Sequence, residues 1–464
     1  MKEQTVLVKI QKLNAHGKGV GPFVNQSDQT FLGEVPYTVP GDEVEASVKR
    51  GRSGQYPARL LNIQTSSSDA ITPRCVHFFS CGGCSFQRLP YEAQARWKEE
   101  KVRHLFRDLL LDTVRFQPIL TSSDPWAYRN KMEFSFSQDK KGERYLGMFL
   151  AGSRGKVFNL TECHLVSPWF AETLAKVRAW WETSGLLAYN PPRNSGSLRT
   201  ITLRESKTTG ERLAMLTVSG NPEDAIHRKD IETFKALFDD HTPVYLRIHQ
   251  AIKGQPTQFY EMHLKGKESI EEKLTIELDP LRKSTLHFSI SPSAFFQPNT
   301  MQAKQLYQSA LKLAELNEED VVYDLYCGTG TLGALASRFV AKVVGIELSP
   351  ESSLDARENA KANQLHNVEI ITGDVGAALK EVKDAPSLVL LDPPRAGLSL
   401  EAVEQVAAFK PKRIVYISCN PETQARDVRL FLERGYDLKL VQPVDQFPQT
   451  LHIENIALLT FRED

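Results

Sequence analysis

The stretch Val321-Val-Tyr-Asp-Leu-Tyr-Cys-Gly-Thr-Gly-Thr-Leu-Gly333 decides the fold of the C-terminal part of the chain. Its first half is an apolar run typical of a buried strand, and Gly328, Gly330 and Gly333 then form a G-x-G-x-x-G loop that opens a helix. Glu347 ends the next expected strand, about 20 residues on, where a carboxylate can accept hydrogen bonds from a ribose diol. The pattern favours a site for a dinucleotide or S-adenosylmethionine, with a purely structural tight turn as the alternative.

Three further strands are expected downstream, and a polar residue stands at the end of each. Residues 368–371 lead to Asp374, residues 387–391 lead into Asp392, and residues 413–418 end at Cys419. Strands that alternate with helices imply a doubly wound parallel α/β sheet, in which ligands bind outside the carboxyl ends of the strands. We therefore expect these residues to converge on one crevice. Hydride transfer has no need of a thiol there, whereas methyl transfer to an unreactive pyrimidine carbon does.

The helix after the second strand is expected over roughly 350–364. A last strand, over 456–461, follows a hairpin-like connection.

Length and composition are those of an ordinary soluble globular protein. At roughly 150 residues per domain, 464 residues predict about three domains. The chain is 41% hydrophobic and 25% charged, which excludes a largely disordered protein. Its 57 basic residues are balanced by 57 acidic ones, so net charge does not argue for nucleic acid, although a local basic groove would suffice to bind it. Because no apolar run approaches a membrane span and no signal-peptide core follows Met1, we expect a cytoplasmic protein without a membrane partner.

The N-terminal part, residues 1–64, is expected to be a small OB-like β-barrel. Five short strands are expected in it, and Gly17-Lys-Gly-Val-Gly21 is expected to be a turn. Four basic residues without an acidic neighbour follow residue 46, namely Lys49, Arg50, Arg52 and Arg59. They form either a solvated loop or a phosphate-contacting surface of an oligonucleotide-binding barrel.

The central region is expected to span residues 65–290, before a third domain over 291–464. It begins with a polar linker, contains a basic helix over roughly 91–111, and then mixes strands and helices in an α+β arrangement. Phe170, Trp180 and Trp181 are expected in its core rather than on a surface that contacts RNA.

Four cysteines of the central region form a candidate metal site. Cys75, Cys81 and Cys84 are closely spaced, and Cys163 lies about 80 residues further on. Disulfides are rare in cytosolic proteins, and four thiolates suit either tetrahedral zinc or an iron–sulfur cluster. The spacing alone does not separate these metals, and unrelated buried cysteines are the alternative. A shared site would join the middle region to the linker.

Several motifs occurring in this order resemble those of the RNA uracil-5-methyltransferase family. They are Phe296-Gln-Pro-Asn299, Asp324-Leu-Tyr-Cys-Gly-Thr-Gly330, Asp392-Pro-Pro-Arg395, Ser418-Cys-Asn-Pro421 and Asp445-Gln-Phe-Pro-Gln-Thr-Leu-His-Ile-Glu454. With the N-terminal barrel, a TRAM-like domain in this family, the resemblance covers nearly the whole chain. It is strongest to the iron–sulfur branch that modifies 23S ribosomal RNA. It implies a class I, Rossmann-like methyltransferase sheet at the C-terminal end, RNA as the partner, and a monomer.

The resemblance also implies the ligands and the residues that hold them. It favours a [4Fe-4S] cluster over zinc at the four cysteines, with a structural or RNA-binding role. The implied S-adenosylmethionine positions are Gln297, Tyr326, Thr331, Glu347, Asp374 and Asp392, of which Glu347 and Asp374 also follow from their places at strand ends. Asp392 could instead meet the target uracil, and Arg395 could contact RNA phosphate or form an ion pair.

The chemistry of uracil methylation needs one thiol and one base near the crevice. C5 of uracil is a poor nucleophile until a thiolate adds to C6, and a base must later remove the C5 proton. Cys419 is the candidate nucleophile, against a merely buried strand-end cysteine, and Glu454 is the candidate base, against a surface glutamate. His452 is expected to orient its neighbours, and Cys327 is expected to be structural.

Three other functions remain possible at this point. One is a 5-methyluridine enzyme that acts on transfer RNA, although its cluster-free relatives would lack the four cysteines. A second is a non-catalytic RNA-binding or assembly protein with a vestigial site, and a nicotinamide oxidoreductase is a remote third.

Overall fold

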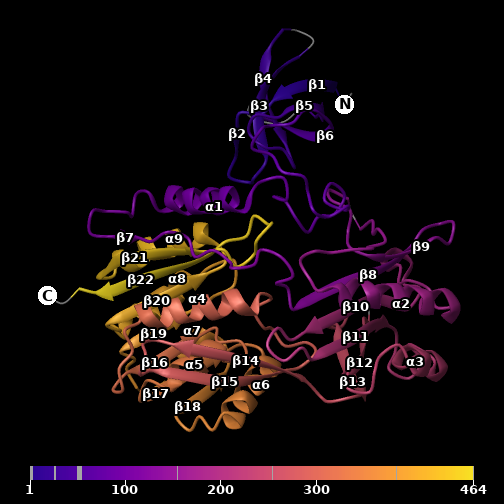
Figure 1. Cartoon of the computed structure of the whole chain (residues 1–464). Coiled ribbons are helices and arrows are strands. Elements are labelled where there is room, and N and C mark those ends of the chain that lie inside the picture. Colours follow the sequence, from indigo (N-terminus) through magenta and orange to yellow (C-terminus); the bar gives the residue numbers. More distant parts are fainter. Residues whose placement is uncertain are drawn as a thin grey trace.

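The computed structural model describes residues 4–25, 28–49, 55–153, 155–252, 254–382 and 384–462. Figure 1 shows a small N-terminal sheet standing above a wide body, in which the C-terminal sheet lies on one side and the central sheet on the other. Within the described ranges, no helix is both long and apolar enough to cross a membrane.

The N-terminal strands form one six-stranded sheet in the order β1-β5-β6-β4-β3-β2. They are β1 (Gln4–Lys9), β2 (Lys12–Leu13), β3 (Gly19–Val24), β4 (Thr30–Val35), β5 (Glu43–Val48) and β6 (Gln55–Thr65). β1 also packs against β3, so the sheet curls around its own apolar core. The prediction of a turn over residues 17–21 is wrong from Gly19 onwards, because β3 begins there. A Cβ on Gly21 would lie 1.9 Å from the Lys9 carbonyl oxygen, so glycine is required by the close approach of another strand rather than by a turn.

Of the four basic residues expected on this sheet, Lys49 and Arg59 are exposed. Arg50 and Arg52 lie outside the described residues.

The central sheet has the order β13-β12-β11-β10-β8-β9. Its strands are β8 (Lys131–Gln138), β9 (Arg144–Gly147), β10 (Leu198–Glu205), β11 (Arg212–Ser219), β12 (Val244–Gln250) and β13 (Gln258–Lys265). Helices α2 (Pro168–Ser184) and α3 (Arg228–Lys235) cover one face, and a 3-10 turn, η1 (Pro191–Arg193), precedes β10. Phe170, Trp180 and Trp181 are buried between α2 and the sheet, as the sequence predicted.

The C-terminal sheet has eight strands in the order β18-β17-β16-β19-β20-β22-β21-β7. The strands are β7 (Arg115–Phe116), β16 (Val321–Leu325), β17 (Lys342–Glu347), β18 (Val368–Thr372), β19 (Leu388–Leu391), β20 (Arg413–Ser418), β21 (Tyr436–Val444) and β22 (Glu454–Phe461). The helices along this part of the chain are α4 (Thr300–Leu313), α5 (Thr331–Ser337), α6 (Pro350–Ala362), α7 (Val375–Ala378), α8 (Leu400–Ala408) and α9 (Pro421–Leu432). β16 to β20 are parallel, which confirms the doubly wound α/β sheet, and β22 inserts antiparallel between β20 and β21.

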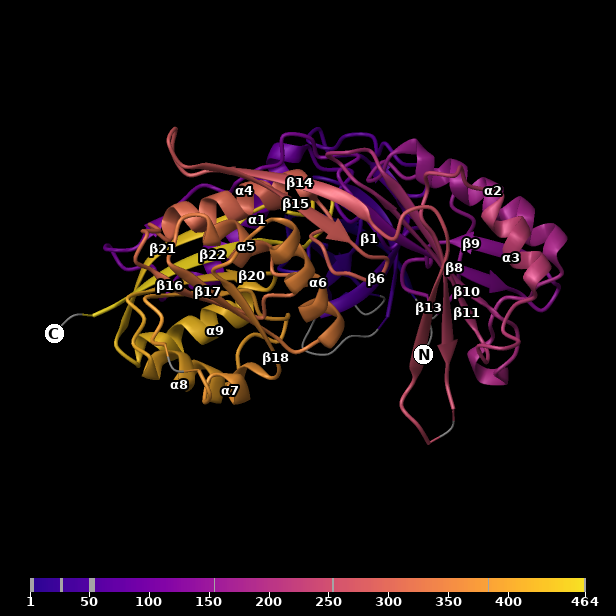
Figure 2. The same cartoon turned by 90° about the horizontal axis from the view of Figure 1, so that it is seen from below.

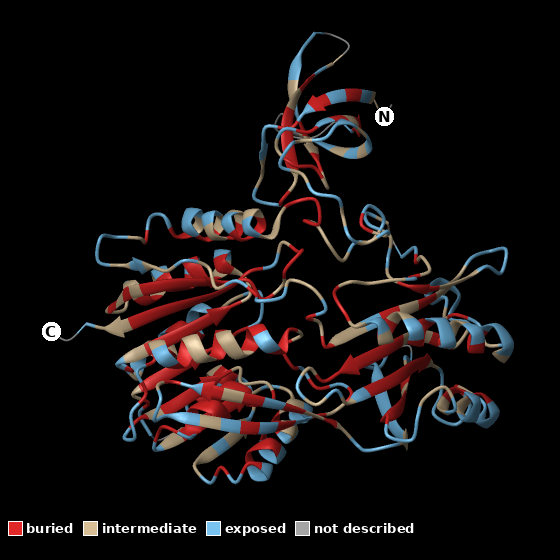
Figure 3. Ribbon diagram, in the orientation of Figure 1, coloured by how far each residue is buried: buried red, intermediate tan, exposed pale blue. Residues whose placement is uncertain are grey.

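Segments from outside residues 291–464 complete this C-terminal body. α1 (Tyr91–Phe106) packs on α9 and β21, and the hairpin of β14 (Ile270–Glu277) and β15 (Lys283–Ile290) packs on α4, α5 and α6. α1 ends before the expected residue 111, because the chain must turn back for β7 to pair with β21. Figure 3 shows the resulting layers of buried strands beneath half-exposed helices. The boundaries at residues 64 and 290 stay predictions.

Candidate functional site

The glycine loop after β16 is shaped for close approach by a ligand. Tyr326, Gly328 and Gly330 have φ values of 63°, 56° and 72°, in the left-handed region that favours glycine. The N–H of Gly333 donates to Asp324 Oδ2 at 2.8 Å, which holds the loop against the end of the strand. A Cβ on Gly328 would meet no atom within 4 Å, so there is free space in front of this turn. The loop therefore fits the adenosine-containing cofactor that the sequence predicts.

Glu347 lies at the end of β17 and is bound to the same loop. Its Oε2 accepts a hydrogen bond from the N–H of Gly328 at 3.0 Å, and its Oε1 accepts one from the N–H of Ser349 at 2.8 Å. The carboxylate is half-buried, so lone pairs on both oxygens remain for a ribose diol. The position and orientation suit the role expected of this residue.

Asp374 and Thr331 are two further predicted cofactor positions near this loop. Asp374 is exposed, begins α7 and accepts the N–H of Ala377 at 3.1 Å. It lies near Tyr326, because its charge contributes, after burial, to the raised pKa of that phenol. Thr331 is buried at the start of α5, 3.2 Å from the hydroxyl of Thr329.

Gln297 connects the 296–299 motif to the connection between β21 and β22. Its buried side chain accepts from Gln446 Nε2 at 3.5 Å, and the same nitrogen donates to the backbone oxygen of Asn299 at 3.1 Å. Asn130 Nδ2 donates to the Gln297 carbonyl at 2.8 Å. Motifs that lie about 150 residues apart in the chain are thus joined by amide hydrogen bonds.

Cys419 and Glu454 meet across two antiparallel strands. β20 and β22 pair with Ser418 opposite Asn455, so continuing the register by one residue puts Cys419 opposite Glu454. Residues opposite one another in such a ladder have Cα atoms about 4.5 to 5.5 Å apart. Glu454 is the first residue of β22 and is 2% exposed, while Cys419 is half-buried. The surface-glutamate alternative is therefore wrong.

The Cys419 loop is also tied to the neighbouring Asp392-Pro-Pro-Arg395 loop. Asn420 Nδ2 donates to the Arg395 carbonyl at 3.0 Å, and the Thr423 hydroxyl donates to the same oxygen at 3.3 Å. Asn420 begins α9 with Pro421 as its first residue, which directs the chain sharply away after the thiol.

When no ligand is bound, burial and nearby charges favour the protonated forms of Cys419 and Glu454. Burial, and then the carboxyls of Glu454 and Asp392, raise the pKa of the Cys419 thiol to about 11. Burial raises the pKa of Asp392 to about 7 and that of Glu454 well above its ordinary value. The Arg395 guanidinium acts in the opposite direction on Cys419 and Glu454. Opposing effects on the pKa values of adjacent groups are typical of reactive sites.

Four cationic side chains lie close enough to His452 to affect its pKa. Burial, followed by the charges of Arg395, Arg129, Lys98 and Lys101, lowers the pKa of His452 to about 4, so its imidazole is neutral at physiological pH. Its ring packs edge-on against Phe447, with centroids 5.8 Å apart. Arg395 is exposed and Arg129 and Lys101 are half-buried, so these three can meet a polyanion, whereas Lys98 is buried.

Sequence reasoning missed the residues that fix the connection between β21 and β22. Lys98 of α1 donates to Asp445 Oδ1 at 2.5 Å and to the Phe447 carbonyl at 3.0 Å, and both charged side chains are completely buried. Gln94 Nε2 donates to Gln449 Oε1 at 3.0 Å. Asp445 was visible as part of a motif, but nothing local identified Lys98 among the other basic residues of α1.

The cysteines Cys75, Cys81, Cys84 and Cys163 line one cavity of about 90 Å³, together with His77 and Arg129. All four are free thiols, and burial raises the pKa of each, to about 11 for Cys75 and about 12 for Cys84. The structure thus brings together residues about 80 positions apart. Throughout the described ranges, however, no three or more His, Cys, Asp or Glu side chains are arranged to hold a metal ion.

Four cysteines around one cavity have the ligand identity that either a zinc ion or an iron–sulfur cluster needs. Their arrangement does not distinguish between the two groups.

Comparisons with known proteins agree with these motifs. The family model described as tRNA (uracil-5-)-methyltransferase matches residues 261–462. A protein of Protochlamydia amoebophila, named an uncharacterized RNA methyltransferase, is 49% identical over 440 residues, which cover 92% of this chain and 99% of that protein. A protein of Caldanaerobacter subterraneus subsp. tengcongensis with the same kind of name is 32% identical over 466 residues, which cover 99% of each.

A solved structure extends the likeness to the whole fold. It is the crystal structure of the Pyrococcus abyssi tRNA (uracil-54, C5)-methyltransferase in complex with S-adenosyl-L-homocysteine. It is 26% identical, has a TM-score of 0.72, and matches 99% of this chain and 100% of that one. The chain therefore belongs to the uracil-5-methyltransferase family of RNA methyltransferases, and it is an enzyme.

Proposed function

We propose that this enzyme transfers a methyl group from S-adenosylmethionine to C5 of a uridine in RNA, with Cys419 as nucleophile and Glu454 as base. The observation that carries the proposal is the register of β20 and β22, which sets the thiol opposite a buried carboxyl. The glycine loop and Glu347 lie at the ends of strands in the same sheet and would hold the cofactor. The solved relative is in complex with the demethylated cofactor product, which supports this assignment.

The reaction follows from what each side chain can hold or move. Bound in the crevice, S-adenosylmethionine supplies an electrophilic methyl group. Cys419 gives its proton to solvent water, and the thiolate adds to C6 of uracil, so that C5 becomes the nucleophilic carbon and accepts the methyl. Glu454, as a carboxylate, then takes the proton from C5, and the C6–S bond breaks to release the thiolate. Arg395 favours the ionised forms of both residues.

Trapping with 5-fluorouridine RNA separates the two roles. After methylation the C5 position carries fluorine instead of a proton, so elimination stalls and the Cys419–RNA bond persists on a denaturing gel. Cys419→Ala should form no adduct and should be inactive. Glu454→Gln should add and methylate ordinary RNA but deprotonate it poorly, so a methylated covalent complex should accumulate.

Cys327→Ala is the matched control, because Cys327 is another half-buried thiol that follows a strand of this sheet. It should still form the adduct. Turnover by Cys419→Ala, or an adduct mapped to Cys327, would refute the assignment.

We propose 23S ribosomal RNA as the substrate, by resemblance to the iron–sulfur branch and because four cysteines surround one cavity. Transfer RNA is the second candidate, because the descriptions of the matching family model and of the solved relative both name tRNA as the substrate. In the test, the enzyme is given ribosomal and transfer RNA from cells that lack its gene, together with S-adenosylmethionine that carries a tritiated methyl group, and the label in each RNA is measured. Label restricted to transfer RNA would exclude the ribosomal assignment.

The remaining expectations follow from this substrate. Cys75, Cys81, Cys84 and Cys163 would hold a [4Fe-4S] cluster that pins the linker to the central sheet, since methyl transfer needs no electron. The N-terminal sheet would serve as a TRAM-like barrel that contacts RNA. The enzyme would act as a monomer in the cytoplasm.

A further inference from the structure

Among the described residues, helices α2 and α3 pack on one face of the central sheet, and we call the other face the open face. The opposite face packs under α2 and α3 through Val218, Ile248 and other apolar residues. Side chains alternate along a strand, so Ser219 and His249, which follow these two residues, point to the open face. At one end of this face, the fully buried Arg204 donates to the carbonyls of Pro292 and Ala294, so the chain leading into the C-terminal body covers it there.

The other end of the open face carries a row of four planar side chains with one serine between them. Arg199 Nη1 donates to Ser219 Oγ at 2.7 Å, Ser219 pairs with His249, and His249 pairs with Phe259. The Arg199 guanidinium lies 4.4 Å from the centre of the Tyr189 ring. We call Tyr189, Arg199, Ser219, His249 and Phe259 the stacking row. It crosses four strands, and at about 4.8 Å between strands its length is roughly 15 Å.

The edge of this row is open to solvent. Phe259 lies on β13, the edge strand, and is 50% exposed. The imidazole of His249 lies 4.8 Å from its ring, and the Arg247 guanidinium lies 4.2 Å from its centre. Arg247 also forms an ion pair with Glu261 at 3.5 Å. Figure 2 shows the β12–β13 hairpin projecting from the body.

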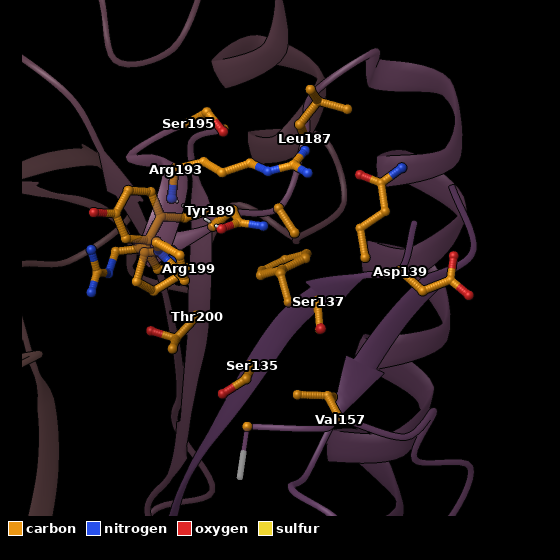
Figure 4. A pocket seen from close by; sticks show the side chains of 18 of the residues that line it. Ser135, Ser137, Asp139, Val157, Leu187, Tyr189, Arg193, Ser195, Arg199 and Thr200 are labelled. Atoms are coloured by element: carbon orange, nitrogen blue, oxygen red, sulfur yellow. Dashed lines mark hydrogen bonds between the residues drawn. The ribbon is translucent and has the colours of Figure 1, made fainter. Parts of the chain in front are cut away.

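A cavity of about 790 Å³ continues the row at its Tyr189 end. Figure 4 shows Tyr189 and Arg199 together on one wall, with Ser135, Ser137 and Asp139 of β8 and its following turn on the other side. The size is within the several hundred Å³ typical of small-ligand sites. Carboxylate and hydroxyl groups on one wall suit the amino groups of bases, while the guanidinium wall suits phosphate.

We propose that the stacking row and this cavity bind unpaired nucleotides of the RNA substrate, outside the site of methyl transfer. Aromatic rings exposed on a sheet, interleaved with guanidinium groups, are how proteins bind single-stranded RNA, because bases stack on the rings and phosphates meet the cations. This inference rests on the proposed function only in taking RNA as the ligand. The surface would select a substrate with an unpaired segment beside the target uridine and would not bind a continuous duplex.

The test compares two neighbouring aromatic residues of β13 in the full-length protein. Phe259→Ala removes a ring of the stacking row, whereas Tyr260→Ala removes an exposed ring from the other face of the same strand. Binding of a fluorescein-labelled single-stranded RNA, and of the same sequence as a duplex, is followed by fluorescence anisotropy without cofactor. Phe259→Ala should weaken single-strand binding about 5- to 150-fold, the range reported for loss of one stacked base. Tyr260→Ala should bind like the wild type.

A photo-crosslink gives an independent readout in the unchanged protein. RNA containing 4-thiouridine should crosslink to peptides that carry Tyr189 or Phe259. Equal losses in both variants, wild-type binding by Phe259→Ala, or crosslinks that avoid both peptides would overturn the proposal. Because no methyl transfer is required, an enzyme that fails to methylate uridine but binds through Phe259 would refute the proposed function alone. An active enzyme indifferent to Phe259→Ala would refute the stacking row alone.

Discussion

Replacing Lys98 with methionine should destabilise the enzyme far more than loss of a surface ion pair. Lys98 and Asp445 are both completely buried, with Nζ and Oδ1 2.5 Å apart. Lys98→Met fills the same space but leaves a buried carboxylate without its cation, and breaking such a pair costs about 3 to 5 kcal/mol. The double variant Lys98→Met/Asp445→Asn removes both charges, so most of that cost should return. The exposed pair of Glu99 and Arg103 on the same helix should be worth only about 0.3 to 0.5 kcal/mol.

The assay is urea denaturation of the single variant, the double variant and Arg103→Ala, with hydrogen exchange reporting separately on α1 and residues 445–453. Exchange in both segments should accelerate in Lys98→Met and recover in the double variant. A cost below about 1 kcal/mol, or a double variant as unstable as the single one, would refute the reasoning.

Three further outcomes are expected. Glu347→Gln should weaken S-adenosylmethionine binding by one or two charge-assisted hydrogen bonds, each about 1.5 to 3 kcal/mol, and calorimetry that shows tight NAD binding instead would overturn the cofactor assignment. In Arg395→Ala the pKa of Cys419 should rise further, so the alkaline rise of kcat/KM should move to higher pH, and an unmoved profile would count against Arg395. Anaerobically purified protein should contain about four irons, which Cys81→Ser should lose and Cys327→Ser should keep, whereas stoichiometric zinc without iron would mean a zinc site.

The part of the fold that local sequence could predict is the part built from neighbours in the chain. Residues 321–333 combine an apolar run with glycines at positions of positive φ, so strand, loop and helix follow from one short segment. By contrast, β7 contributes only Arg115 and Phe116, and its pairing with β21 depends on contacts hundreds of residues away. The packing of the β14–β15 hairpin is equally hard to predict, because its alternating buried and exposed residues do not show which body it covers.

The residues of the candidate site also differ in how far the local sequence could predict them. Cys419 could be placed at a strand end from its own neighbourhood, whereas the burial of Glu454 depends on β22 entering the middle of the sheet. Lys98 has the same local surroundings as other basic residues of α1, and only tertiary packing makes it the buried one. The stacking row was hidden because Arg199 lies at a bulge in β10, where strict alternation of faces fails.

The central position of β22 also sets an order of assembly. β20 and β21 are both made before β22, and although each already has one neighbour, β19 or β7, the strand that joins them is missing until residues 454–461 have been translated. Glu454 is the first residue of that insertion, so the strand that closes the sheet is also the one that brings the proposed base to Cys419. By the proposed mechanism, a chain interrupted before this point would keep its glycine loop and Cys419 but could not release RNA to which it had become bonded. Only a chain that has been translated past β22 and has inserted this strand can therefore complete a catalytic cycle.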